Sequence, residues 1–151
     1  MALQGKETDQ YPFSETIRVR FRDTDSQGHL YFANYLVYAD ELTGFYMDQL
    51  GFKAATPDQA PCYVFTVNVQ CDYHDEVAAN GLVRGFVRYN RLGRSSAEVA
   101  FLLQSDSDSR VLASGKITQV FVDPATRQSI PIPDFFRTNI LARQPELVDP
   151  E

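Results

Sequence analysis

Two kinds of hydrophobic spacing divide this chain of 151 residues. Over residues 15–21 apolar and polar side chains alternate, with Val19 and Phe21 among the apolar ones, as in a half-buried β-strand. Over residues 35–50 the apolar side chains instead recur at helical spacing, and Gly51 stands where a helix would end. The pattern therefore predicts a strand followed by one deeply buried helix of about 16 to 18 residues.

Four further strand-like runs follow the predicted helix, without a second stretch of comparable helical periodicity. The joins between the last three runs are short and rich in turn-forming residues, which is typical of antiparallel hairpins. One apolar helix has only such a sheet to pack against, so we expect an α+β fold, a curled five-stranded antiparallel sheet around a long central helix. A partner subunit is expected to cover the remaining sheet surface. The four runs are residues 62–73, 82–90, 96–104 and 110–123.

The length and composition of the chain fit one domain with its own core. Hydrophobic residues make up 44% of the sequence, and neither a secretory segment nor a membrane-spanning run is recognisable. We therefore expect a soluble cytoplasmic protein without membrane insertion. Cys62 and Cys71 form neither a CxxC motif nor a disulfide framework, which favours two buried thiols in a reducing compartment.

Charge narrows the range of expected ligands. The net charge of −6 repels polyanions, so nucleic acid is not an expected partner. Four arginines nevertheless fall within eleven residues, namely Arg84, Arg88, Arg91 and Arg94. Such a cluster suits a compact phosphorylated ligand, although a solvated strand face has the same pattern.

The loop between the first strand and the helix holds the best candidate for chemistry. Asp23 and Asp25 lie in it and are followed by Gly28 and His29. Asp and Gly also build ordinary tight turns, and an Asp before a helix is a common cap. A carboxylate just ahead of a helix, however, faces free backbone N–H groups that can bind a developing oxyanion. Hydrolysis of an acyl bond requires this pairing.

The run FRDTDSQGHLYFANYLVYADE resembles the signature of the 4-hydroxybenzoyl-CoA thioesterase-like group of the hot-dog superfamily, which includes the Tol-Pal-associated acyl-CoA thioesterases. The resemblance continues through VQCDYHDEV, LGRSS and VFVDPATRQSIPIP. It implies a hot-dog thioesterase domain over residues 15–135, with a flexible N-terminal segment at residues 1–14 and a C-terminal tail at residues 136–151. After Pro133 the sequence leaves both a short terminal helix and disorder open. It also implies a homodimer or homotetramer with active sites at the dimer interface.

Within this resemblance the catalytic acid is Asp25, which acts as a nucleophile or as a general base for water. The backbone N–H of Phe32 is the implied oxyanion donor. Tyr31, the first residue of the aromatic pair that opens the helix, is assigned to substrate binding. Asp23 is expected to hold the turn. His29 is either a solvated or hydrogen-bonded loop histidine or a further catalytic residue, because its Gly-His pair is similar to that of related long-chain acyl thioesterases.

Two further segments are implied in substrate binding. In hot-dog proteins the second strand reaches the neighbouring subunit's substrate, and the turn LGRSS resembles their CoA-facing hairpin, where basic and hydroxyl groups meet nucleotide phosphates. The strand candidates are Val64, Phe65, Thr66 and Asn68, and the turn candidates are Arg91, Arg94, Ser95 and Ser96. His29 and His74 lie too far apart in sequence for a helix-borne zinc pair, and neither a metal nor a cofactor is expected.

The predicted function is hydrolysis of an acyl-CoA or aroyl-CoA thioester to the free acid and CoA. One alternative is a non-catalytic acyl-CoA-binding module of the same fold. Another is an acyl carrier protein (acyl-ACP) thioesterase, although a net charge of −6 mildly disfavours docking of an acidic carrier. A hot-dog dehydratase would rely on a histidine paired with an acid at other positions, and the sequence has no such arrangement.

Overall fold

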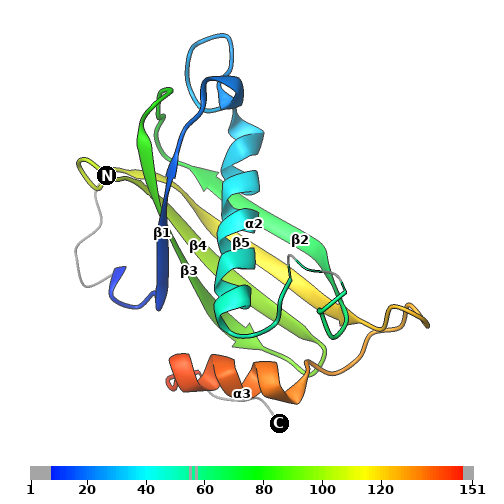
Figure 1. Ribbon diagram of the computed structural model, residues 1–151. Helices are drawn as coiled ribbons and strands as arrows, with labels where there is room; N and C mark the ends of the chain where they lie inside the picture. The colour runs from blue at the N-terminus through cyan, green and yellow to red at the C-terminus, as the bar shows by residue number, and fades with distance from the viewer. Residues whose placement is uncertain (1–7, 55, 57, 148–151) are drawn as a thin grey trace. The chain divides into compact units, whose positions relative to one another are not determined.

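The computed structural model describes residues 8–54, 56 and 58–147. Strand β1 (Phe13–Arg18) and the 3-10 helix η1 (Phe21–Asp23) precede the long helix α2 (Phe32–Gln49), and four strands follow. These strands are β2 (Tyr63–Tyr73), β3 (Leu82–Leu92), β4 (Ser96–Ser105) and β5 (Val111–Val122), and helix α3 (Asp134–Arg143) comes after them (Figure 1). The predicted order of one strand, one long helix and four strands is confirmed.

The strands form one five-stranded sheet in the order β1-β3-β4-β5-β2. β1 runs antiparallel to β3, with Phe13 opposite Val87 and Arg18 opposite Leu82. The strands β3, β4 and β5 follow one another along the chain and are neighbours in the sheet, as successive hairpins require. The expected α+β fold with a curled antiparallel sheet is therefore confirmed, and β1 and β2 form its two edges.

The chain forms two compact units, and each unit contains part of α2 and part of each of the strands β2 to β5. The first unit consists of the residues up to Leu42 together with Cys71–Arg88 and Phe101–Gly115. The second unit consists of Thr43–Gln70, Tyr89–Ala100 and the chain from Lys116.

In the first unit, α2 packs tightly against β3. A Cβ atom added at Gly85 would collide with the side chain of Leu42, so only glycine permits this approach of helix and strand. Val19 and Val83 are fully buried in the same unit. The helical periodicity of the sequence therefore corresponds to a helix face in close contact with the sheet.

In the second unit, α3 closes an aromatic core. Phe136 is buried, and its ring lies 4.9 Å from that of Phe52 and 6.0 Å from that of Phe121, measured between ring centroids. For the predicted tail the sequence left a short helix and disorder both open, and residues 134–143 form a helix that buries Phe136 and Ile140.

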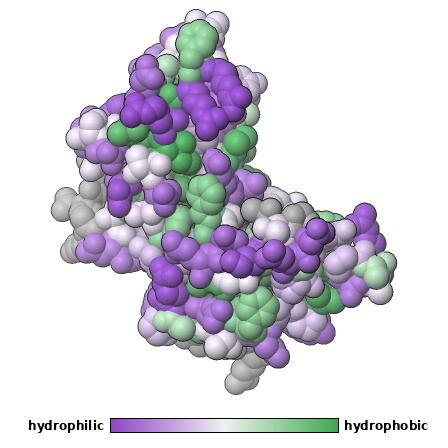
Figure 2. Space-filling view, in the orientation of Figure 1, coloured by the Kyte–Doolittle hydropathy of each residue, from purple (hydrophilic) through white to green (hydrophobic). Residues whose placement is uncertain are grey.

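One strand boundary and one side-chain direction were predicted wrongly. The sequence extended the first strand to Phe21 and placed that side chain in the core, but β1 ends at Arg18 and Phe21 is 86% exposed. The reason is that Val19 leaves the strand ladder and exchanges backbone hydrogen bonds with Asn80 and Gly81 of the β2–β3 connection. Exposed hydrophobic side chains are a general feature of this molecule: the face in Figure 2 shows hydrophobic residues among hydrophilic ones.

Both cysteines are free thiols, but the expectation that both are buried holds only for Cys62. Cys62 is buried and Cys71 is half-buried, and burial is the main cause that raises the pKa of each thiol. Among the helices in the described part of the chain, none is long and apolar enough to cross a membrane.

Candidate active site

The loop between β1 and α2 forms a tight turn around Asp25. The N–H of Gly28 donates to the Asp25 carbonyl (3.0 Å), and the N–H of Asp25 donates to the His29 carbonyl (2.8 Å). Gly28 has a φ of 80°, in the left-handed region that glycine enters at little cost. The N–H of Leu30 donates to the Val77 carbonyl (2.8 Å), which ties the end of the loop to the β2–β3 connection. The turn-forming residues thus place Asp25 on a well-held backbone.

The carboxylate of Asp25 is anchored through one oxygen. Its Oδ1 accepts hydrogen bonds from the backbone N–H groups of Gln27 (2.9 Å) and His29 (3.3 Å). No hydrogen bond among the described residues involves Oδ2, and the residue is only half-buried. A carboxylate with one oxygen anchored and the other open can attack a carbonyl carbon or accept a proton from water.

Asp23 is occupied in holding the loop to the helix. Its Oδ2 accepts a hydrogen bond from the Tyr38 hydroxyl (2.8 Å), and its carbonyl accepts one from the Asn34 side-chain amide (2.9 Å). Burial, and next the hydrogen bond to Asp23, raise the pKa of Tyr38 well above its ordinary value. These contacts give Asp23 the structural role that the sequence suggested.

The start of α2 lies directly after this loop. The N–H of Tyr31 donates to the Asp23 carbonyl (2.9 Å), and the N–H of Asn34 donates to the Tyr31 carbonyl (2.8 Å). The N–H of Phe32 makes no hydrogen bond within the described part of the chain. N–H groups in the first turn of an 18-residue helix carry partial positive charge and attract anions. Phe32 therefore offers a backbone donor for a developing oxyanion.

An exposed aromatic surface surrounds the start of α2. Tyr31, Phe32 and Tyr73 are 45%, 61% and 46% exposed, although the ring centroids of Tyr31 and Phe32 are only 4.7 Å apart. Tyr73, at the end of β2, makes edge contacts with the rings of Phe32 (6.3 Å) and Tyr35 (5.2 Å). These rings are a ready surface for an apolar acyl group.

His29 lies beside an acidic segment of the β2–β3 connection. Its Nδ1 is 3.5 Å from the Glu76 carboxylate, and both side chains are partly exposed. The preceding residue, Asp75, accepts a hydrogen bond from the Tyr35 hydroxyl at its carbonyl (3.1 Å) and pairs with Arg110 through its carboxylate (2.8 Å). The hydrogen bond from Arg110 is the main cause that lowers the pKa of Asp75. His29 thus has a carboxylate neighbour that its sequence position does not indicate.

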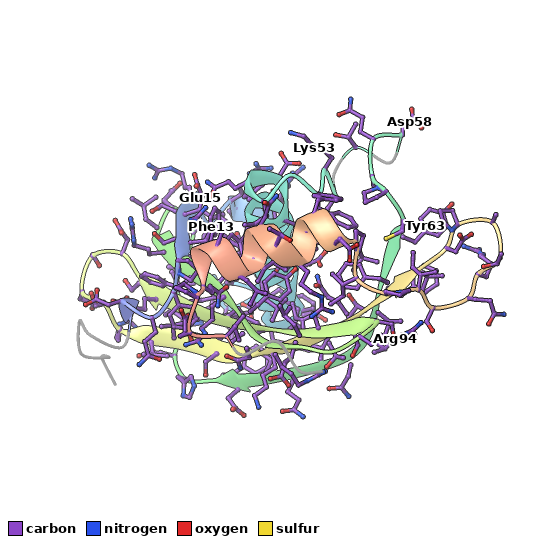
Figure 3. The ribbon with its side chains drawn as sticks, turned by 90° about the horizontal axis from the view of Figure 1, so that it is seen from below. Phe13, Glu15, Lys53, Asp58, Tyr63 and Arg94 are labelled. Carbon is purple, nitrogen blue, oxygen red and sulfur yellow. The ribbon has the colours of Figure 1, made fainter. Side chains whose placement is uncertain are left out.

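The strand candidates lie on β2 in the second unit. Phe65 and Thr66 are exposed and Val64 is half-buried. The Phe65 ring stacks on that of Tyr63 at a centroid distance of 6.0 Å, and the Arg127 guanidinium lies 5.5 Å from the Tyr63 ring and 6.0 Å from the Phe65 ring. Figure 3 shows Tyr63 at the beginning of β2. Arg127 is a neighbour of these candidates that the sequence pattern does not reveal.

The predicted CoA-facing turn also belongs to the second unit. The N–H of Gly93 donates to the Ser96 carbonyl (2.7 Å), and the N–H of Phe121 donates to the Ser95 carbonyl (2.9 Å). The backbone is therefore fixed, whereas the side chains of Arg91 and Arg94 are exposed (Figure 3 labels Arg94). Neither guanidinium forms an ion pair with any described residue.

The structure brings the loop and helix-start candidates together in the first unit, namely Asp25, His29, Tyr31 and Phe32. The remaining candidates, Val64, Phe65, Thr66, Asn68, Arg91, Arg94, Ser95 and Ser96, lie in the second unit. The arginine cluster of the sequence is divided in the same way. Arg84 donates to the Ser14 hydroxyl (2.9 Å) and Arg88 to the Gln10 side chain (3.2 Å), both within the first unit. Among the described residues, no group of three or more His, Cys, Asp or Glu residues is placed to hold a metal ion.

Comparison with known proteins identifies the class. The model of the Thioesterase-like superfamily matches residues 19–140, and the chain therefore belongs to this superfamily. Membership places it among the thioester hydrolases, as the sequence predicts. No significant match was found among curated proteins.

Solved structures agree on the fold. A thioesterase from Thermus thermophilus, complexed with coenzyme A and Zn, is 23% identical and superposes with a TM-score of 0.81, covering 93% of this chain and 99% of its own. A 1,4-dihydroxy-2-naphthoyl-CoA thioesterase from Synechocystis is 16% identical (TM-score 0.78, 85% and 94% covered). A thioesterase described as putative, from Pseudomonas aeruginosa, is 26% identical (TM-score 0.78, 86% and 98% covered). The predicted hot-dog fold is confirmed.

Proposed function

We propose that this protein hydrolyses an acyl-CoA or aroyl-CoA thioester to the free acid and CoA, with Asp25 as the catalytic carboxylate. The observation that carries the proposal is that Asp25 keeps Oδ2 open next to the start of α2, where the Phe32 N–H is also unpaired among the described residues. A thioester carbonyl placed between them would meet a nucleophile or base on one side and an oxyanion donor on the other. The Thermus thermophilus relative, which was solved with coenzyme A, supports CoA as the thiol.

Two routes are consistent with an acid in this position. As a nucleophile, Asp25 Oδ2 attacks the carbonyl carbon, the C–S bond breaks, CoA leaves as thiolate and water then hydrolyses the mixed anhydride. As a general base, Asp25 takes a proton from water while the water oxygen attacks the same carbon, the C–S bond then breaks, and the departing CoA thiolate is protonated. Label in the Asp25 carboxylate after a single turnover in ¹⁸O-labelled water would show the nucleophilic route with water attack at Cγ of Asp25, because the general-base route labels only the released acid.

Substitution of Asp25 by Asn tests the proposal. Asn keeps an oxygen that can accept from the Gln27 and His29 N–H groups, so the turn should stay intact. Hydrolysis of an acyl-CoA panel, followed by free-thiol detection, should fall by about 10²- to 10⁴-fold in kcat. Asp106→Asn, at an exposed aspartate of the same unit, is the matched control and should retain wild-type activity. Full activity of Asp25→Asn would contradict the proposal, and tight CoA binding without hydrolysis by wild type would favour a non-catalytic binding module.

We assign the nucleotide end of CoA to Arg91, Arg94, Ser95 and Ser96. The two guanidinium groups are exposed on a fixed turn and can pair with phosphates. Arg94→Gln should raise KM several-fold with little change in kcat. Added salt should reduce the difference in KM between the variant and wild type, because salt screens exposed ion pairs. An acyl-pantetheine substrate without the nucleotide should show no such effect. An acyl-ACP substrate, tested alongside, decides between the two thiol donors.

We further propose that two copies pair through β2 and that Val64, Phe65 and Thr66 thereby reach the acyl site of the neighbouring copy. β2 is an edge strand, and one of its faces exposes a row of large apolar side chains, Tyr63, Phe65, Val67 and Val69. Such an edge favours pairing with another strand. Val67→Lys should shift the protein to a smaller species in analytical ultracentrifugation, whereas Gln49→Lys, at an exposed position of α2, should not. A monomeric wild type would contradict this proposal.

A further inference from the structure

Tyr73 makes a hydrogen bond that none of the assigned catalytic roles requires. Its hydroxyl, at the end of β2, donates to the backbone carbonyl of Phe32 (2.9 Å). Phe32 is the first residue of α2. The carbonyl that Tyr73 holds and the N–H that would donate to the oxyanion belong to this same residue and are joined through its Cα atom. The strand therefore holds the helix at the residue that supplies the oxyanion donor in the proposed function.

The backbone around the Phe32 N–H is fixed on both sides. Before it, the Tyr31 N–H donates to the Asp23 carbonyl (2.9 Å), and after it the Phe32 carbonyl accepts from Tyr73. The first turn of a helix frays readily, because its N–H groups lack partners within the helix. Two external hydrogen bonds that bracket one residue limit the rotation of that residue, and hence the direction of its N–H. An oxyanion donor acts at full strength only when its direction is fixed before the reaction.

The Tyr73 ring is itself held in place. It meets the Tyr35 ring edge-on at 5.2 Å with an interplanar angle of 87°, and it meets the Phe32 ring edge-on at 6.3 Å. The Tyr35 hydroxyl donates in turn to the Asp75 carbonyl (3.1 Å). Burial is the main cause that raises the pKa of Tyr73 to about 12, so its hydroxyl remains protonated, and a donor, throughout the pH range of an activity assay.

We infer that Tyr73 is a positioning residue, whose hydroxyl orients the backbone N–H of Phe32 toward the thioester oxygen by fixing the Phe32 carbonyl. This inference rests on the proposed function. Tyr73 acts through the backbone of α2 and makes no bond to the substrate, so it should affect the rate of the chemical step and leave substrate affinity unchanged.

The test is Tyr73→Phe, which keeps the ring contacts and removes only the hydroxyl. We expect kcat for acyl-CoA hydrolysis to fall about three- to tenfold, the worth of one hydrogen bond, with KM unchanged. The matched control is Tyr11→Phe, the same substitution at a half-buried tyrosine of the first unit whose ring packs against Phe86, and it should leave kcat unchanged. An unchanged kcat in Tyr73→Phe would overturn the inference. A rise in KM at unchanged kcat would also overturn it, since that pattern belongs to a substrate contact.

A second readout does not depend on activity. In ¹⁵N NMR spectra, Tyr73→Phe should shift the amide resonances of Phe32 and Ala33, whereas Tyr11→Phe should leave both resonances unchanged. If wild type hydrolyses no thioester, the proposed function fails, and these amide signals still decide whether Tyr73 fixes the start of α2. Unchanged amide signals in Tyr73→Phe would overturn the positioning role even in an active enzyme.

Discussion

In the first unit the polar groups near the start of α2 lie at or near the surface, whereas the second unit seals a set of polar side chains inside its core. Gln144 is only 1% exposed, and its Oε1 accepts from the Tyr46 hydroxyl (2.9 Å) and from the Tyr89 N–H (2.9 Å). Its Nε2 donates to the Tyr89 carbonyl (2.8 Å), and the Tyr89 hydroxyl donates to Gln119 (3.0 Å). Burial raises the pKa of Tyr89 well above its ordinary value.

The difference lies in what replaces each hydrogen bond when it is lost. Water can take the place of a missing partner around Asp25, which is half-buried, so such a bond contributes about 0.5 to 1.5 kcal/mol net. Water cannot enter around Gln144 without opening the core, and an unsatisfied buried group costs about 1 to 3 kcal/mol. Substitutions in the first unit's loop should therefore change activity with little effect on stability, and substitutions in the second unit's core should do the reverse.

The largest effect on stability is expected from Phe136→Ala. This side chain is fully buried against Phe52 and Phe121, and truncation of a buried Phe costs about 3 to 5 kcal/mol in unfolding free energy. Urea unfolding followed by circular dichroism measures it. Phe135→Ala, next to it on α3 but at a side chain that is 43% exposed, is the matched control and should cost less than about 1 kcal/mol. Equal losses in the two variants would contradict the buried core role of α3.

A smaller loss is expected from Gln144→Leu, which keeps the volume of the side chain and removes its hydrogen bonds. The Tyr46 hydroxyl and the Tyr89 backbone groups then lose their partner inside the core, at a cost of about 2 kcal/mol. The kcat of the folded fraction should stay at the wild-type value. Gln49→Leu, at an exposed position of α2, should change the unfolding free energy by less than about 0.5 kcal/mol. If Gln144→Leu unfolds at the wild-type urea concentration, the network contributes no stability.

The sequence predicted elements whose signal repeats over many residues. Residues 35–50 carry helical periodicity over several turns, and the strands from β2 to β5 have clear apolar runs bounded by turn-forming residues. For the segment that forms helix α3 the sequence left a short helix and disorder both open, because Phe136 and Ile140 are its only buried residues and give too short a repeat to decide. Phe21 was misplaced because strand alternation continued in the sequence after the backbone had left the ladder.

The residues of the candidate site also differ in whether the sequence alone could locate them. Asp23, Asp25 and Gly28 are close in sequence, and turn chemistry connects them, so the loop could be located from the sequence alone. The contact between Tyr73 and Phe32 joins residues 41 positions apart, and the contact between Gln144 and Tyr89 joins residues 55 apart. No local pattern encodes such pairs, because the folded sheet and helices determine which residues meet.

The smallest effect is the dependence of stability on pH that the Arg110 contacts in the first unit should produce. The Arg110 side chain is the main cause that lowers the pKa of Asp75. The pKa of Asp108 is lowered mainly by the Arg110 backbone N–H, which Gln would keep, and to a smaller extent by the Arg110 side chain. A carboxylate with a lowered folded pKa stabilises the protein above its unfolded pKa, about 3.9, and this contribution is lost as the pH falls through the folded pKa. Arg110→Gln should therefore be less stable than wild type at pH 7, and the difference should shrink below about pH 4.

The two units are compared most directly when the stability of Arg110→Gln is measured beside that of Gln144→Leu. The groups around Gln144 are neutral, so the stability deficit of Gln144→Leu should be the same at pH 7 and pH 3, whereas that of Arg110→Gln should diminish. Lys116→Gln, which removes an exposed positive charge, is the control for general charge effects. Urea midpoints at the two pH values measure all three variants. A pH-independent deficit for Arg110→Gln would mean that its contacts to the Asp75 and Asp108 carboxylates add no stability, and that its hydrogen bond to the Glu76 carbonyl (3.2 Å) carries the effect.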